Sequence, residues 1–272
     1  MNKESLDKLH DTLIEILDYV VSVCEENNLT YFLVYGTALG AYRHQGFIPW
    51  DDDLDIAMPR QDYEKLIEIM NQSNNEKYVL QNELNEKKYY LPFSKVRKKG
   101  TKFVEDIAQD MYENEGIFID IFVLDYVKDI YTFKYKLKSY VTTYLKHILR
   151  YTVYKKAYRD KRKFFGRIME NIICIPAYIL PKKVLLRFFN KMAKGNCLSD
   201  KVGYIVEYSE EKSKSAMPID VYFPPKKIEM CGKQYYAPNK IEDYLTRAYG
   251  SSYMELPPIE QRVTHSPIEL IF

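Results

Sequence analysis

Four aspartates, Asp51, Asp52, Asp53 and Asp55, stand within the short stretch "PWDDDLDIAMPR" at residues 49–60. The alternation from residue 52 to residue 58 predicts a β-strand, with Asp53 and Asp55 on the same face and apolar residues on the other. Like charges at this spacing repel each other, and the repulsion grows when the face is half-buried. The stretch therefore predicts that something cationic lies against it.

The remaining composition limits the class of fold. The chain has 272 residues, of which 46% are hydrophobic, enough for one large domain or one domain with an insertion. The net charge is only +2, yet residues 131–194 hold 17 Lys and Arg residues against Asp160 and Glu170. This asymmetry predicts that the basic segment meets an anionic surface or polymer.

The cysteines and the N-terminus favour a cytoplasmic protein. The four cysteines are scattered and form no CxxC pair, so disulfides and zinc sites are not indicated. The first residues are charged and amphipathic, unlike a signal peptide. The longest apolar run, residues 172–180, is too short to span a bilayer. His10, His44 and His147 have no supporting constellation in the sequence.

Periodicity predicts a mixed α/β core with a helical insertion. Helices are expected over 5–27, 37–46 and 60–72, strands over 31–36, 77–83 and 116–127, and a hairpin over 93–105 that turns near Gly100. Residues 131–194 are helical and basic, and short strands and a helix follow. The predicted division is a catalytic core (1–130), a basic helical insertion (131–199) and a C-terminal part that completes the core (200–272).

A third acid joins the first two in this interpretation. Asp120 is the one charge at the centre of the apolar run "GIFIDIFVLDYV", where an unpaired buried carboxylate is costly. Together with Asp53 and Asp55 it offers carboxylates from two strands, which suits Mg²⁺ or Mn²⁺. An EF-hand is excluded because Ile56 stands where that loop needs glycine. The alternative is a solvated acidic loop.

Candidate phosphate contacts precede and follow the acids. The Gly36–Thr37 turn permits close approach of a phosphate, and Thr37 is a candidate N-cap of the next helix. Arg43 is a candidate diphosphate contact, or it pairs with Asp51 or Asp52. Lys95 and Arg97 share one face of a strand and point either toward the site or to the surface.

The stretches "YGTALGAYRHQGFIPWDDDLDIAMPRQDYEKL", "FIDIFVLD" and "YLTRAYGSSYMELPP", with a late "RVTHSP", resemble the LicD family. That family belongs to the nucleotidyltransferase-fold superfamily. The resemblance covers about residues 10–127 and 200–272, and residues 131–194 lie outside it. It implies an α+β fold with a nucleotidyltransferase-like mixed sheet core flanked by helices. The superfamily pattern falls on Gly36–Thr37, on Asp53 and Asp55, and on Asp120.

The resemblance also implies a reaction. LicD enzymes transfer phosphocholine from CDP-choline to a sugar hydroxyl of a cell-surface glycan precursor, such as a capsule or teichoic acid precursor, and release CMP. Related members transfer other CDP-activated groups, including ribitol phosphate. Asp53, Asp55 and Asp120 are then the metal ligands and catalytic acids, and Asp120 is the candidate general base. His265 lies in the matching late motif and either contacts substrate or caps the fold.

Trp50 and the basic segment have alternative interpretations. Trp50 is a candidate choline contact, because quaternary ammonium groups favour aromatic faces, but it also fits a core position. The basic segment is either a solvated helical cap or a surface that lies on an anionic membrane, where a lipid-linked acceptor is found. No nucleic acid is expected, because no recognised module accompanies the charge. Two other functions stay open, nucleotidyl transfer from an NTP and non-catalytic binding of phosphocholine or glycan.

Overall fold

A computed structural model of the chain describes residues 1–105, 112–127, 133–194 without 161–163, 200–204, 216–262 and 264–272. The helices of eight or more residues are α1 (Lys3–Glu26), α2 (Tyr35–His44), α3 (Arg60–Gln72), α4 (Phe133–Asp160), α5 (Phe164–Ile173), α7 (Lys182–Ala193) and α9 (Ile241–Tyr249). The shorter ones are α6 (Ile175–Ile179), α8 (Ile219–Tyr222) and the 3₁₀ turn η3 (Ile259–Gln261).

A mixed sheet forms the centre of the molecule. Its strands are β1 (Phe32–Leu33), β2 (Asp55–Pro59), β6 (Phe118–Tyr126), β4 (Ser94–Lys98) and β3 (Tyr78–Gln81) in spatial order, with β7 (Lys201–Tyr204) paired to β6 and β8 (Ala216–Pro218) paired to β7. Strands β2 and β6 are parallel, and the other pairs are antiparallel. Two smaller sheets pair β9 (Lys226–Met230) with β10 (Lys233–Ala237), and β5 (Lys102–Val104) with β11 (Glu269–Ile271).

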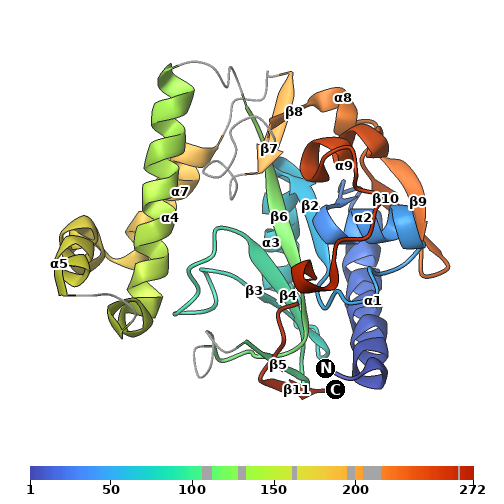
Figure 1. Cartoon of the computed structure of the whole chain (residues 1–272), viewed down its shortest axis with the longest axis horizontal. Coiled ribbons are helices and arrows are strands. Elements are labelled where there is room, and N and C mark those ends of the chain that lie inside the picture. Colours follow the sequence, from blue (N-terminus) through green and yellow to red (C-terminus); the bar gives the residue numbers. More distant parts are fainter. Residues whose placement is uncertain (106–111, 128–132, 161–163, 195–199, 205–215, 263) are drawn as a thin grey trace.

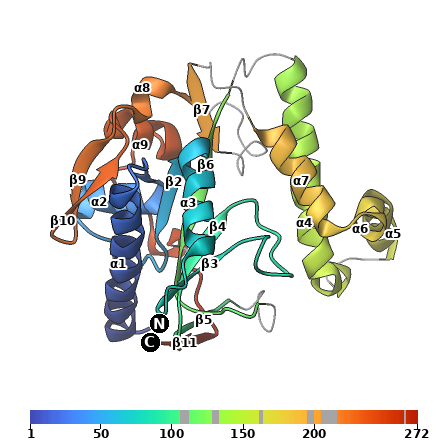
Figure 2. The same cartoon turned by 180° about the vertical axis from the view of Figure 1, so that it is seen from behind.

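Helices α1 and α3 cover one face of the sheet, as Figure 2 shows. Helix α1 is capped by Asn2, whose side chain accepts a hydrogen bond from the Ser5 amide at 2.8 Å, and the apolar stripe of the helix is buried against the strands. Asp125 of β6 points toward α3, where Arg60 donates to both of its carboxylate oxygens at 3.0 and 2.6 Å. Because side chains alternate along a strand, Asp120 lies on the opposite face.

Helices α4 to α7 form a separate layer at one side of the sheet (Figure 1). Their buried apolar side chains make a second cluster with Val127 and Ala216, distinct from the main core; it includes Leu145, Ile148, Leu149, Leu185 and Phe189. Helix α5 is the element farthest from the sheet in both views. The proposed division into a core, an insertion and a C-terminal part remains a prediction.

The mixed α+β architecture is confirmed, and several expected elements are corrected. The predicted hairpin over 93–105 is wrong, since β4 pairs with β3 and β6 while β5 pairs with β11 in another sheet. Helix α2 begins at Tyr35, so Thr37 is in its first turn and is not its N-cap. The strand expected from residue 52 begins at Asp55, because Asp51–Leu54 form the approach to the sheet.

Candidate active site

A row of polar side chains crosses four neighbouring strands on the face away from α1 and α3. Asp55 of β2 is opposite Asp120 of β6, Asp120 is opposite Lys95 of β4, and Lys95 is opposite Gln81 of β3. Register partners project to the same side of a sheet, so these four side chains lie next to one another. Such a buried polar row is incompatible with a merely solvated acidic loop, because Asp55, Lys95 and Gln81 are all buried.

The first turn of α2 binds Asp55, the residue at one end of the row. The hydroxyl of Thr37 accepts a hydrogen bond from the backbone amide of Asp55 at 2.8 Å, and both residues are buried. A side chain at Gly36 would place its Cβ 2.7 Å from the Asp51 carboxylate, closer than van der Waals contact allows. Glycine and threonine at these positions therefore bring helix α2 against the acids.

Burial and mutual repulsion change the acidity of three carboxyls. Burial, followed by the charges of Asp53 and Asp120, raises the pKa of Asp55 well above its ordinary value. Burial also raises the pKa of Asp53. Burial, the charge of Asp53 and a hydrogen bond with it raise the pKa of Asp51 to about 8. Asp51 therefore retains a proton at neutral pH, and the raised pKa values of all three acids are those expected of carboxylates that lack enough positive charge around them.

Lys95 is the cation that the structure places within the row. Its ammonium nitrogen lies 2.6 Å from Asp120 Oδ1 and 3.5 Å from the centroid of the Phe118 ring. Asp120 is thus paired, contrary to the expectation of an uncompensated charge. Arg97, two residues along β4, is also buried and donates to the Gln81 side chain at 2.6 Å and to the Gly116 carbonyl at 2.5 Å. The surface interpretation of Lys95 and Arg97 is wrong.

Asp52, unlike the neighbouring aspartates, binds the C-terminal segment of the chain. Its carboxylate accepts hydrogen bonds from the backbone amides of His265 and Ser266 at 2.9 and 3.0 Å, and it lies 3.1 Å from Nδ1 of His265. Burial opposes ionisation, but these hydrogen bonds hold the pKa of Asp52 below its ordinary value. The hydrogen bond to Asp52 and the charge of Asp53, 3.6 Å away, raise the pKa of His265 to about 9. An ionised pair therefore fixes the C-terminal segment beside the acids.

Arg43 and Trp50 make their contacts with the same C-terminal segment. Arg43 donates to the carbonyls of Tyr253 and Glu255 at 2.7 and 3.1 Å. The guanidinium carbon of Arg262 lies 4.2 Å from the centroid of the Trp50 ring, so one face of that ring already meets a cation. The described part of this segment runs from α9 past the sheet to β11 (Figure 1). Roles for Arg43 and Trp50 in substrate binding remain predictions.

The sequence placed Asp51 in the acidic stretch but not among the metal ligands, and it did not identify two further residues near the acids, Gln81 and Tyr249. Asp51 shares a hydrogen bond with Asp53, and Gln81 lies at the end of the polar row. Tyr249 of α9 has a raised pKa, caused by burial of its hydroxyl, by Tyr244 and by the charges of Asp55, Asp51 and Asp53. Only the tight spacing of "DDDLD" pointed to Asp51; the positions of Gln81 and Tyr249 depend on tertiary packing that leaves no local signal.

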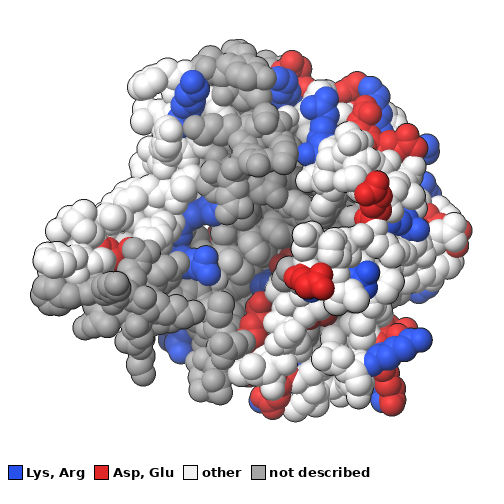
Figure 3. Space-filling model, in the orientation of Figure 1, with Lys and Arg blue, Asp and Glu red and all other residues white. Residues whose placement is uncertain are grey.

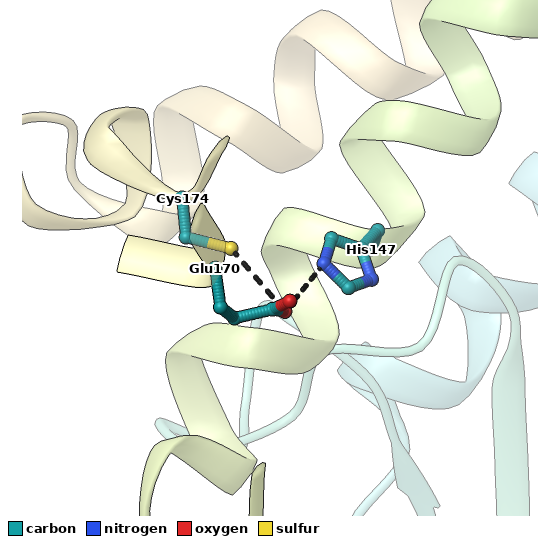
Figure 4. Close-up of side chains that lie close together, drawn as sticks. All are labelled: His147, Glu170 and Cys174. Carbon is teal, nitrogen blue, oxygen red and sulfur yellow. Dashed lines mark hydrogen bonds and ion pairs between the residues drawn. The ribbon is translucent and has the colours of Figure 1, made fainter. Parts of the chain in front are cut away.

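A second polar cluster lies in the helical layer (Figure 4). Nε2 of His147 on α4 is 2.7 Å from Glu170 Oε1 on α5, and the Cys174 thiol is 3.9 Å from the same oxygen. His147 therefore has partners that its sequence context did not indicate. Within the described residues, these three form the group of potential metal-ligand side chains with atoms within 4.8 Å of one another. The acids of the main site are spread more widely, as mutual repulsion favours.

The fold and site define a mixed α+β protein with a buried carboxylate cluster between a sheet and the start of a helix. Comparison with known proteins shows what the chain is similar to. Residues 28–156 match the model described as "LicD/FKTN/FKRP, nucleotidyltransferase domain". The chain is 28% identical over 267 residues to the lipopolysaccharide cholinephosphotransferase LicD of Haemophilus influenzae, with 97% of both chains covered. The expected resemblance to the LicD family is confirmed, since the family model matches part of this chain and the similarity to that cholinephosphotransferase extends over almost the whole of both chains.

Two shorter similarities involve proteins without an assigned function. An uncharacterised protein of Rickettsia prowazekii is 41% identical over 61 residues, which is 22% of this chain and 23% of that protein. An uncharacterised protein of Rickettsia typhi is 43% identical over 51 residues, or 19% of this chain and 16% of that protein. The chain spans less than a quarter of either protein, so these matches add no functional information.

Proposed function

We propose that this protein transfers phosphocholine from CDP-choline to a hydroxyl of a cell-surface glycan or its lipid-linked precursor and releases CMP. The observation that carries the proposal is the buried row of Asp55, Asp120 and Lys95 beside Asp53, in a chain that aligns almost end to end with a cholinephosphotransferase. Lipopolysaccharide is the acceptor in that relative's name. For this chain we propose only the chemical class, a sugar hydroxyl.

We further propose that Asp53, Asp55 and Asp120 hold Mg²⁺ or Mn²⁺. The donor set fits, because hard carboxylate oxygens suit these ions and because the raised pKa values of Asp53 and Asp55 reveal a shortage of positive charge. Asp51 belongs to the same set, since it hydrogen-bonds Asp53. A bound divalent ion would supply neutralisation of the diphosphate of the donor.

The chain's own residues supply position and proton transfer in this proposal. The acceptor oxygen attacks the phosphorus that carries choline, the bond from that phosphorus to the CMP oxygen breaks, and the hydroxyl proton passes to Asp120. Lys95, 2.6 Å from Asp120, holds that carboxylate in place. The amides at the start of α2, close to Gly36, are candidate donors to the diphosphate.

The binding of choline is assigned to aromatic side chains near the acids. One face of Trp50 is taken by Arg262, which makes Tyr249 the better-placed candidate, because 42% of it is exposed and because burial of its hydroxyl and the charges of the acids raise the pKa of that hydroxyl. A quaternary ammonium against an aromatic face adds about 0.5–2 kcal/mol. The nucleotidyltransferase-like fold, a cytoplasmic location and an acceptor at the inner face of the plasma membrane complete the proposal.

The test combines ligand binding with product analysis on the full chain. CDP-choline with Mg²⁺ should raise the melting temperature, and EDTA should remove the shift. CDP-glycerol, which lacks the cation, should give a smaller shift. Incubation with an acceptor glycan should release CMP, whereas the Asp53→Asn variant should release none. Pyrophosphate release from CTP or ATP, with no CMP from any CDP-alcohol, would instead establish nucleotidyl transfer, and binding without turnover would establish a binding protein.

A further inference from the structure

Helix α5 is amphipathic, and its apolar side faces outward. Ile168, Met169 and Ile172, at helical spacing along one side, are 42%, 56% and 54% exposed. Phe165, one turn earlier, is 80% exposed. A helix on a water-soluble surface normally turns this side to the core. Helix α5 therefore exposes to solvent the apolar side that a surface helix normally buries.

The polar cluster of Figure 4 explains what fixes this orientation. Glu170 lies on the inward side of α5, is only 5% exposed, and pairs with His147 of α4 at 2.7 Å. Cys174, one turn further, is fully buried and directs its thiol to the same carboxylate at 3.9 Å. Because the polar side is occupied by α4, the apolar side of α5 can only face away from the protein.

The apolar surface continues past α5 without interruption in sequence. In α6 and the residue after it, Ile175, Ile179 and Leu180 are 47%, 71% and 42% exposed. We name the side chains of Ile168, Met169, Ile172, Ile175, Ile179 and Leu180 the outer apolar face. In Figure 3 the outer end of the helical layer, at the left over α5, is largely free of charged colours where residues are described. Contiguous apolar surface of this kind marks an interaction site.

We propose that the outer apolar face inserts into the interfacial layer of an anionic membrane. The charge of the surrounding chain selects this occupant, since residues 131–194 hold 17 Lys and Arg residues against two acids. That excess attracts anionic headgroups and opposes a second copy of the same surface. No helix among the described residues is long and apolar enough to cross a bilayer, so the contact lies in the plane of the interface. The inference rests on the proposed function only in placing the acceptor at this surface.

Vesicle sedimentation with the full chain tests the proposal. Wild type should sediment with vesicles that contain phosphatidylglycerol, much less with phosphatidylcholine alone, and less in high salt, since 1 M salt shortens the Debye length to about 3 Å. The double variant Ile172→Ser/Ile179→Ser should bind at least tenfold more weakly. The matched control Ile259→Ser removes a side chain that is 73% exposed on η3, outside the face, and should bind like wild type.

Three results would overturn the proposal: no vesicle binding by wild type, an equal loss in the Ile259→Ser control, or concentration-dependent dimerisation that the double variant abolishes while vesicles have no effect. The last result would assign the face to a second copy. Turnover of CDP-choline with a soluble acceptor should be unchanged in the double variant. Normal turnover without vesicle binding would refute the membrane face alone, and vesicle binding without turnover would refute the proposed function alone.

Discussion

The proton held by Asp51 makes the stability of the metal-free protein depend on pH. Its pKa is raised from 3.8 to about 8 by burial and by Asp53. Between those values the folded protein retains a proton that the unfolded chain has lost, so the free energy of unfolding falls as pH rises through this window. Asp51→Asn removes the titration but keeps the size of the side chain and a donor toward Asp53.

The expected effect follows from proton linkage. One retained proton changes the free energy of unfolding by about 1.4 kcal/mol per pH unit, so from pH 5 to pH 7 wild type should lose about 3 kcal/mol relative to Asp51→Asn. For a chain of this size that corresponds to about 5–10 °C in melting temperature. The lowered pKa of His10 has the opposite sign over part of this range. It is common to both proteins, and therefore cancels in the difference.

The assay is thermal or urea unfolding of wild type, Asp51→Asn and Asp243→Asn in EDTA at several pH values. Asp243 is an exposed carboxylate of α9 and serves as the matched control. Saturating Mg²⁺ should remove the difference in slope, since the proposed ion displaces the proton. Parallel pH profiles for wild type and Asp51→Asn in EDTA would refute the assignment of a retained proton to this site.

Three further changes give independent tests. Thr37→Val leaves the buried Asp55 amide without its acceptor and should cost about 1–3 kcal/mol in unfolding free energy, with activity reduced, whereas Thr37→Ser should restore both. Arg60→Met removes the arginine that pairs with the buried Asp125 carboxylate and should cost about 3–5 kcal/mol by urea denaturation, and adding Asp125→Leu should recover most of it. His265 has a raised pKa of about 9, so its pairing with Asp52 stabilises the protein below about pH 6.5 and is lost as pH rises through 9. His265→Gln should make the C-terminal segment more susceptible to protease at pH 7. An unchanged cleavage rate would contradict the inference that this pair fixes the segment beside the acids.

Local patterns predicted the elements that carry strong periodicity. Helix α3 has the bounds that its spacing indicated. The short strands expected after residue 200 include β9 and β10, which form a hairpin that turns at Cys231–Gly232, where positive φ angles of 52° and 75° suit a tight turn. The hairpin over 93–105 failed because both halves have strand propensity, while partners elsewhere in the chain decide the pairing. Residues 94–98 enter the central sheet, and residues 102–104 pair instead with the C-terminus.

The site was predictable to the extent that it is local. The spacing of Asp53 and Asp55 and the lone charge of Asp120 indicated carboxylates on one sheet face, and the register places Asp55 beside Asp120. The orientation of Lys95 was ambiguous, because strand alternation shows which residues share a face but not whether that face is buried. The contacts of His265 with Asp52 and of Arg43 with Tyr253 join positions more than 200 residues apart in sequence, which no periodicity reveals.

The charges of the site also suggest an order of binding. Four carboxyls, Asp51, Asp53, Asp55 and Asp120, outnumber the nearby cations Lys95 and His265, and the proton on Asp51 reduces this imbalance in the metal-free protein. A diphosphate donor brings further negative charge to the same place, and the proton on Asp51 does not neutralise the diphosphate. The proposed divalent ion reduces the repulsion among the carboxylates and their repulsion of the diphosphate, because it replaces the proton and its charge attracts both groups. We therefore expect CDP-choline to bind with or after the ion, and to bind weakly to a site that is still protonated.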